Sequence, residues 1–140
     1  MRIAACVGSD CISCLDHCVA EARTAGLDDA AILQAIKDAE CVKRSACDET
    51  AAHAREVLGL AAQPPPDCRS EDSLEKQLVW LGSAVAVSAA FQTRKHLDAA
   101  RAQGATDEQL ASVMMLGRWA QTCARRSLRG RPPQRQRRRP

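Results

Sequence analysis

The residues best suited to chemistry lie in residues 10–18, a stretch that holds three of the eight cysteines and one of the three histidines. Within it, Cys11 and Cys14 form a Cys-x-x-Cys pair. In a helix these two positions share a face and lie close enough for a disulfide. Asp10 is predicted to cap this helix, which places Cys11 in the first turn. Unpaired amides and the helix dipole favour a thiolate there, so the spacing predicts a reactive dithiol.

His17 follows Cys14 by three positions, so its ring is expected to reach the sulfur from the next turn and act as a base or cationic neighbour. The predicted catalytic residues are therefore Cys11, Cys14 and His17, and no cofactor is predicted. The alternative for both cysteines is that they only fill an alanine-rich helical core, where free cysteine is common. For His17 the alternative is an exposed, unengaged side chain.

A metal site is a second interpretation of the same stretch, with Cys11, Cys14 and Cys18 as ligands. In one helix Cys11 and Cys18 are about 10 Å apart along the axis, at roughly 1.5 Å per residue. Two sulfurs on one zinc ion lie roughly 4 Å apart, given Zn–S bonds near 2.3 Å. The four ligand-type residues of the stretch therefore cannot close on one ion while the helix is intact. A metal would need partners from elsewhere, such as Cys41 or Cys47.

Composition favours an all-α fold. The chain has 140 residues, of which 46% are apolar, but only Trp80, Trp119 and Phe91 are aromatic. Alanine-rich sequences with few β-branched runs favour packed helices. No apolar run has the length of a membrane span, and residues 1–20 are too charged for a signal peptide. We therefore expect a cytoplasmic protein with no membrane partner, whose cysteines are reduced apart from the dithiol pair.

Helical periodicity predicts six segments. The predicted helices cover residues 2–8, 11–25, 29–58, 74–91, 93–103 and a last one after Thr106. Gly8, Gly26 and Gly104 are predicted to end helices, while Asp28, Ser70 or Ser73, and Thr106 are predicted to cap them. The last helix is expected to bury a stripe made of Leu110, Val113, Met114, Gly117 and Ala120. The proline-rich residues 61–73 are predicted to be a linker.

The two sides of that linker resemble each other at a constant offset of 78 residues. Gly26 corresponds to Gly104 and Arg23 to Arg101. In the same register Cys11, Cys14 and Cys18 fall on Ala89, Gln92 and His96. The predicted organisation is a first repeat in residues 1–60, the linker in 61–73, a second repeat without the dithiol in 74–128, and a disordered tail in 129–140.

The pattern of Cys11, Cys14, a nearby histidine, and Ala-Arg-x-x-Gly followed by an acidic helix start resembles the carboxymuconolactone decarboxylase/AhpD-like (alkyl hydroperoxidase D) superfamily. The resemblance spans roughly residues 1–128 and implies an all-α tandem repeat that assembles as trimers or hexamers. It implies that Cys14 is the peroxidatic thiolate and Cys11 the resolving thiol. The family histidine lies four residues after the second cysteine, where this chain has Cys18, so His17 is one place early. The family's relay glutamate would precede Met1, and its counterpart in the second half is Gln77.

The resemblance thus implies a thiol-dependent peroxidase or disulfide reductase, with a peroxide or disulfide as substrate and a dithiol as reductant. Three alternatives stay open: a non-catalytic helical oligomer with a vestigial site, metal or metalloid binding by the cysteines, and a decarboxylase-like lyase. The remaining cysteines and both His53 and His96 are predicted to be structural or satisfied side chains, with Cys68 exposed in the linker.

The carboxyl-terminal residues differ sharply in charge from the rest of the chain. Residues 125–140 contain eight arginines and no acid, so the remainder holds 12 basic and 17 acidic side chains. Such a tail cannot bury apolar surface and is expected to be disordered. Nucleic acid is a candidate partner only through this tail, and a solubilising extension without a specific partner is the alternative. No aromatic residue lies between the arginines, so base stacking is not indicated.

Overall fold

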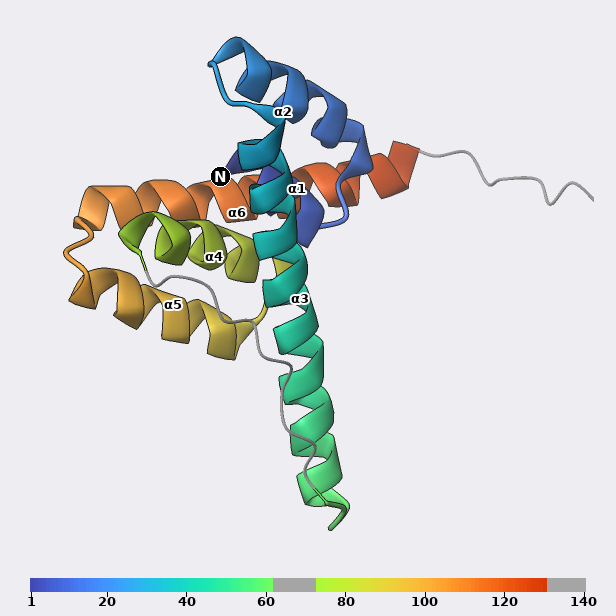
Figure 1. The fold of residues 1–140 in the computed structure, drawn as a ribbon. Helices are drawn as coiled ribbons and strands as arrows, with labels where there is room; N and C mark the ends of the chain where they lie inside the picture. Colours follow the sequence, from blue (N-terminus) through green and yellow to red (C-terminus); the bar gives the residue numbers. More distant parts are fainter. Residues whose placement is uncertain (62–72, 131–140) are drawn as a thin grey trace, which may run out of the picture.

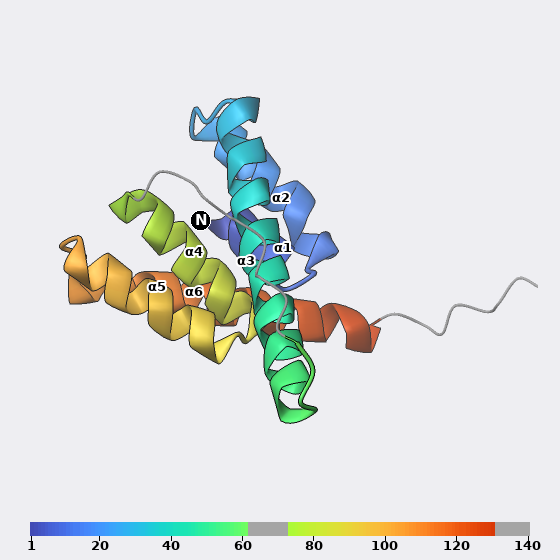
Figure 2. The same ribbon diagram turned by 60° about the horizontal axis from the view of Figure 1, so that its bottom comes forward.

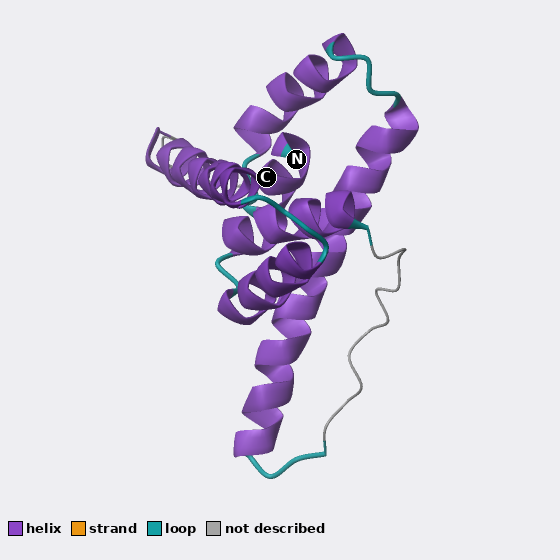
Figure 3. Ribbon diagram, turned by 90° about the vertical axis from the view of Figure 1, so that its left-hand side faces the viewer, coloured by secondary structure: helices purple, strands orange, loops and turns teal. Residues whose placement is uncertain are grey.

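The computed structural model describes residues 1–61 and 73–130, in which six helices and no strand occur. The predicted all-α class is confirmed for this part of the chain (Figure 3). The helices are α1 (Arg2–Gly8), α2 (Ile12–Thr24), α3 (Asp29–Val57), α4 (Leu74–Val87), α5 (Ala90–Ala102) and α6 (Asp107–Gly130).

Helix α4 is the centre of the packing, because α1, α3, α5 and α6 all contact it (Figure 1). The short helix α1 lies among α2, α3, α4 and α6 and is buried along most of its length. Helix α3 crosses this group, and its carboxyl-terminal half extends away from the other helices (Figure 1 and Figure 2). No residue of α3 beyond Val42 is buried. We call residues 43–57 of α3 the arm.

The α4–α6 contact is close enough to require glycine. A Cβ added to Gly117 would lie 2.7 Å from the side chain of Val85 and 2.8 Å from the carbonyl oxygen of Gly82, closer than real Cβ contacts. Leu81 and Val113 fill the space beside this crossing and are almost fully buried. The stripe predicted for the last helix is confirmed at its buried positions, and Met114 is packed against the same core.

Three of the predicted helix starts are confirmed by their capping bonds. Asp28 Oδ1 accepts from the amide of Ala31 at 2.7 Å, and Ser73 Oγ accepts from Lys76 at 3.3 Å. Thr106 Oγ1 accepts from the amide of Gln109 at 3.2 Å, while Gln109 Oε1 accepts from the amide of Thr106. This reciprocal pair satisfies two amides that the helix itself leaves unpaired.

The prediction that Asp10 caps the cysteine helix is wrong. The cap position is Cys11, which makes no side-chain capping bond, so Cys11 lies before the first turn rather than in it. Asp10 has a left-handed backbone (φ 56°), and its carboxylate accepts from Lys43 on α3. Gly8 does not end α1 by a left-handed turn either. It lies within α1, where an added Cβ would meet the carbonyl oxygen of Ser83 at 3.1 Å.

The predicted helix over residues 74–91 is also wrong at its end. Helix α4 ends at Val87, because Ser88 adopts a left-handed conformation (φ 63°), and α5 then begins at Ala90 rather than near Thr93. Apolar residues continue through this break, so periodicity alone did not reveal it. The break gives α5 a start that matches the start of α2.

Elements on the two sides of the linker follow each other at an offset of 78 residues. Helices α2 and α5 each contain 13 residues, and α3 and α6 begin at Asp29 and Asp107. The left-handed residues Asp10 and Ser88 are related by the same offset. Gly26 and Gly104 are as well, with φ values of 86° and 88°. Cys11 and Ala89 accordingly hold equivalent positions at the starts of α2 and α5.

Parts of two sequence predictions lie outside the described residues. These are residues 62–72 of the predicted linker, including Cys68, and residues 131–140 of the predicted tail. Helix α6 runs to Gly130, two residues past the predicted end of the second repeat. Among the helices that the structure describes, none is both long and apolar enough to cross a membrane.

Candidate thiol site

The start of α2 fixes both cysteines of the Cys-x-x-Cys pair. The amide of Cys11 donates to the carbonyl of Cys6 at 2.9 Å, which ties the start of α2 to α1. The amide of Cys14 donates to the carbonyl of Cys11 at 3.2 Å. Cys11 is 2% exposed, whereas Cys14 is only partly buried. Of the two thiols, Cys14 is therefore the one that a reagent can approach.

Cys14 lies between two other thiols. Its side chain hydrogen bonds with Cys11 and also with Cys123, which α6 brings from 109 residues further along the chain. The hydroxyls of Ser13 and Ser127 lie 2.6 Å apart and join the same two helices beside the thiols. Cys123 carries no sequence motif, so its place at this site depends on the packing of α6 against α2 and was missed by sequence reasoning.

These contacts change the acidity of Cys14. The hydrogen bond with Cys11, followed by burial and the hydrogen bond with Cys123, raises the pKa of Cys14 to about 12. Each of these causes disfavours the thiolate, because a charged sulfur loses the proton that it shares and is less well solvated. The effect opposes the thiolate stabilisation expected from the helix terminus. At neutral pH Cys14 is a thiol.

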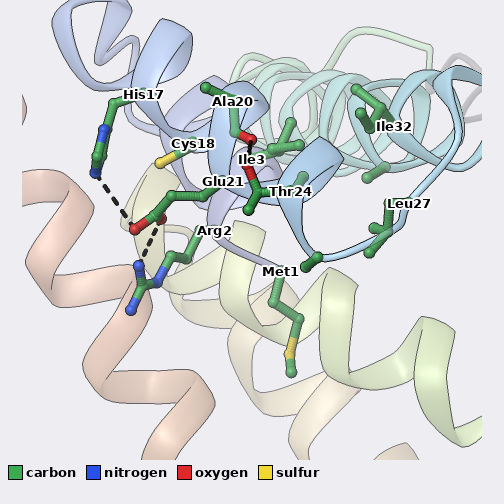
Figure 4. Close-up of a pocket in the computed structure, with 13 residues that line it drawn as sticks. Met1, Arg2, Ile3, His17, Cys18, Ala20, Glu21, Thr24, Leu27 and Ile32 are labelled. Atoms are coloured by element: carbon green, nitrogen blue, oxygen red, sulfur yellow. Dashed lines mark hydrogen bonds and ion pairs between the residues drawn. The ribbon is translucent and has the colours of Figure 1, made fainter.

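His17 is not brought to Cys14. Its Nε2 atom lies 3.3 Å from Glu21 Oε1, and its side chain is 74% exposed. Figure 4 shows the ring directed toward Glu21, which also accepts from Arg2. His17 lines a pocket of about 700 Å³ between α1, α2 and the start of α3. The structure thus joins Cys11 and Cys14 and places the third predicted residue in a separate ion pair.

A second pair of thiols lies behind the first. The sulfur atoms of Cys6 on α1 and Cys18 on α2 are 3.6 Å apart, and the two side chains are 1% and 2% exposed. Burial, followed by the hydrogen bond with Cys18, raises the pKa of Cys6. Cys6 had no motif around it, so only the crossing of two helices reveals the pair. We call Cys6, Cys11, Cys14, Cys18 and Cys123 the thiol site.

The arrangement of the cysteines does not assemble metal ligands. Among the described residues, no group of three or more His, Cys, Asp or Glu side chains is placed to hold a metal ion. Cys18 faces Cys6, while Cys14 faces Cys11 and Cys123. The suggested partners from elsewhere do not change this, since Cys41 is disulfide-bonded and Cys47 is exposed on α3.

The second half of the chain carries a chain of polar contacts at the equivalent location. His96 Nδ1 lies 2.9 Å from Gln77 Oε1, and His96 Nε2 lies 3.0 Å from Gln92 Oε1. The Nε2 atom of Gln92 donates to Glu49 Oε1 on the arm at 2.6 Å. Gln77, Gln92 and His96 are buried, and the ring of Trp80 lies 5.2 Å from that of His96. We call Glu49, Gln77, Gln92 and His96 the polar network.

Both ring nitrogens of His96 therefore have partners, which confirms the prediction of a satisfied histidine; His53 is exposed, as predicted, with Nδ1 3.6 Å from Glu56. Burial raises the pKa of Glu49, opposed by the hydrogen bond from Gln92 and the charge of Lys95. Glu49 and Phe91 line a groove of about 1490 Å³ between the arm and the α4–α5 connection. The participation of Glu49 was not predicted, because it comes from a helix outside the second repeat.

Comparison of the chain with protein-family models, with curated proteins and with solved structures found no match.

Proposed function

We propose that this chain is a tandem-repeat, AhpD-like thiol oxidoreductase in which Cys11 and Cys14 alternate between a dithiol and a disulfide. The observation that carries the proposal is the position of Cys14, a partly buried thiol in hydrogen-bonding contact with the buried thiol of Cys11. The offset of 78 residues that relates α2 to α5 and Asp10 to Ser88 supports the repeat.

The proposed reaction begins at the accessible sulfur. Cys14 attacks a disulfide, releases one thiol and keeps the other as a mixed disulfide; Cys11 then attacks Cys14 and releases the second thiol. With a peroxide, Cys14 becomes a sulfenic acid as the peroxide is reduced to an alcohol or water, and Cys11 displaces water from it. An external dithiol reduces the Cys11–Cys14 disulfide and is itself oxidised. The substrates are thus a small peroxide or disulfide and a dithiol.

The raised pKa of Cys14 favours disulfide reduction over peroxide reduction within this proposal. Only the thiolate attacks, so a thiol that keeps its proton reacts slowly with peroxide near neutral pH. The same effect destabilises the thiolate form of the reduced pair and leaves the disulfide relatively more stable, which makes the dithiol a stronger reductant. We therefore assign disulfide reduction as the main activity and peroxide reduction as a slower one that grows with pH.

Turnover with dithiothreitol as reductant tests the proposal. The wild-type chain should reduce a small-molecule disulfide and, more slowly, consume hydrogen peroxide. Cys14→Ser should lower both rates to background, while Cys47→Ser, which removes an exposed thiol elsewhere, should leave them unchanged. Full activity in Cys14→Ser would refute the assignment.

A non-catalytic helical oligomer with a vestigial site is the second candidate, favoured by the ion pair of His17 with Glu21 and by the protonated Cys14. Intact mass after mild oxidation separates the two candidates. A loss of two hydrogens confined to residues 10–15 and reversed by dithiothreitol supports the enzyme. A chain that stays fully reduced supports the oligomer.

We also propose a cytoplasmic homo-oligomer. Six of the described cysteines are free, as a reducing compartment would keep them. Val57, Leu58 and Leu60 at the end of the arm and Phe91 on α5 are apolar and largely exposed, which suits contact with another copy. Sedimentation equilibrium tests this assignment, and a monomer at micromolar concentration would contradict it.

A further inference from the structure

Cys6 and Cys18 are placed as closely as two reduced thiols can be. Their sulfur atoms are 3.6 Å apart, and a disulfide bond of about 2.05 Å requires them to approach by about 1.5 Å. The two residues lie on different helices, so closing the bond needs side-chain rotation rather than unwinding of either helix. Because the side chains are 1% and 2% exposed, an oxidant in solution does not reach them directly.

The first pair is the nearest source of an oxidised sulfur. Cys6, Cys11 and Cys18 are packed in one apolar cluster with Ile3 and Ile32, and Cys14 lies against it. The carbonyl of Cys6 accepts from the amide of Cys11 at 2.9 Å, so the backbones of these two cysteines touch. Cys11 and Cys14 both act electrostatically on the thiol of Cys6. Cys6 therefore lies between Cys18 and the Cys-x-x-Cys pair.

We propose that Cys6 and Cys18 are a second, internal dithiol that is oxidised by exchange with the Cys11–Cys14 disulfide. This inference rests on the proposed function, which supplies that disulfide from a peroxide or disulfide substrate. In the first step the sulfur of Cys6 attacks Cys11, the Cys11–Cys14 bond breaks, and Cys14 takes up the proton that Cys6 loses. Cys18 then attacks Cys6, the Cys6–Cys11 bond breaks, and Cys11 takes up the proton from Cys18.

The exchange balances within the chain. Cys6 and Cys18 lose two electrons and two protons, Cys11 and Cys14 gain them, and no further reagent is consumed. Afterwards the accessible pair is again a dithiol and can reduce a second substrate molecule. One chain therefore takes up two oxidising equivalents before an external dithiol is needed, and the second is held in a covalent link between α1 and α2.

The sequence allows a direct measurement. Cleavage on the amino side of Asp10, Asp16 and Asp28 gives the fragments 1–9, 10–15 and 16–27, which separate Cys6, the Cys11–Cys14 pair and Cys18. Fully reduced protein is treated with a small excess of hydrogen peroxide at pH 8, and samples are quenched in acid, alkylated, cleaved and weighed. The expected order is an internal disulfide in fragment 10–15 first, followed by fragments 1–9 and 16–27 joined through one disulfide.

The Cys11→Ala variant distinguishes exchange from direct oxidation, with Cys47→Ala as the matched control. Joining of fragments 1–9 and 16–27 should slow at least tenfold in Cys11→Ala and be unchanged in Cys47→Ala. Joining at the wild-type rate in Cys11→Ala would overturn the exchange. If the wild type closes the disulfide in fragment 10–15 but never joins the other two fragments, the internal pair is refuted while the proposed function stands. If fragment 10–15 never closes, the proposed function and the exchange both fail.

Discussion

The thiol site and the polar network lie at equivalent places in the two halves of the chain, but they hold different chemistry. Cys11 and Ala89 precede helices of equal length, and each follows a residue with a left-handed backbone. In the first half, the positions that follow carry thiols that hydrogen bond with one another. In the second half they carry Gln92 and His96, joined to Gln77 and Glu49. The backbone therefore does not determine the chemistry, and one geometry accommodates both.

The comparison also separates two properties that an active dithiol combines. The thiol site has sulfur atoms but no imidazole beside Cys14, because His17 pairs with Glu21. The polar network has an oriented imidazole but no sulfur. The largest expected differences between the two sites therefore concern thiol acidity, and the following predictions test them in order of decreasing effect.

Alkylation of Cys14 should depend steeply on pH. Because its pKa is raised to about 12, the thiolate fraction and the iodoacetamide rate should rise about tenfold per pH unit from pH 7 to pH 10, without a plateau. That is about a thousandfold in total. The measurement is the labelling of fragment 10–15 in reduced protein, with the exposed Cys47 as internal control. A plateau near pH 8.5 would show that the neighbouring thiols do not affect Cys14.

Moving the cysteines into the second half should produce a more acidic dithiol. In the double variant Ala89→Cys, Gln92→Cys, the sulfur at position 92 lies beside His96, where Gln92 Oε1 now lies 3.0 Å from the ring. An adjacent imidazolium stabilises a thiolate. We expect alkylation at position 92 to be at least tenfold faster than at Cys14 at pH 7. Adding His96→Ala to this variant should abolish the difference, and its persistence would contradict the role of the imidazole.

Removing the imidazole from the wild-type chain should cost stability. His96→Ala deletes both ring contacts and leaves the buried side chains of Gln77 and Gln92 with one partner fewer. The expected loss in the free energy of unfolding is about 2–4 kcal/mol, measured by urea denaturation. A change below about 0.5 kcal/mol would show that the polar network does not stabilise the fold.

The matched change in the first half should have the smallest effect. His17→Ala removes an exposed side chain and one surface ion pair. We expect the free energy of unfolding to change by less than about 0.5 kcal/mol, and the rate of Cys11–Cys14 disulfide formation to change less than twofold. A tenfold slower disulfide would instead assign His17 the role of base that its spacing predicted.

Local signals accounted for much of the fold. Asp28, Ser73 and Thr106 were readable as caps because a capping side chain acts within three residues of itself, and the buried stripe of α6 followed from its helical period. The break at Ser88 was missed because apolar residues continue through it. For Asp10, a contact 33 positions away with Lys43 replaced the predicted cap. Long-range contacts of this kind are not encoded in any local pattern.

The same distinction applies to the sites. The pairing of Cys11 with Cys14 could be predicted from helical spacing alone, since both lie on α2. The contributions of Cys6, Cys123 and Glu49 depend on how α1, α6 and the arm cross other helices, and none of these residues has a motif. His17 has the right spacing, but a side chain in a helix has neighbours on either side, and Glu21 is one turn away.

The arm gives helix α3 two sources of stability along one continuous backbone. Up to Val42 the helix is held by tertiary burial, whereas beyond it no residue is buried and the hydrogen bond from Gln92 to Glu49 is a contact with α5. Helical segments without tertiary packing open readily in water. Amide hydrogens should therefore exchange progressively faster from Val42 toward Val57, with the slowest exchange in the arm near Glu49.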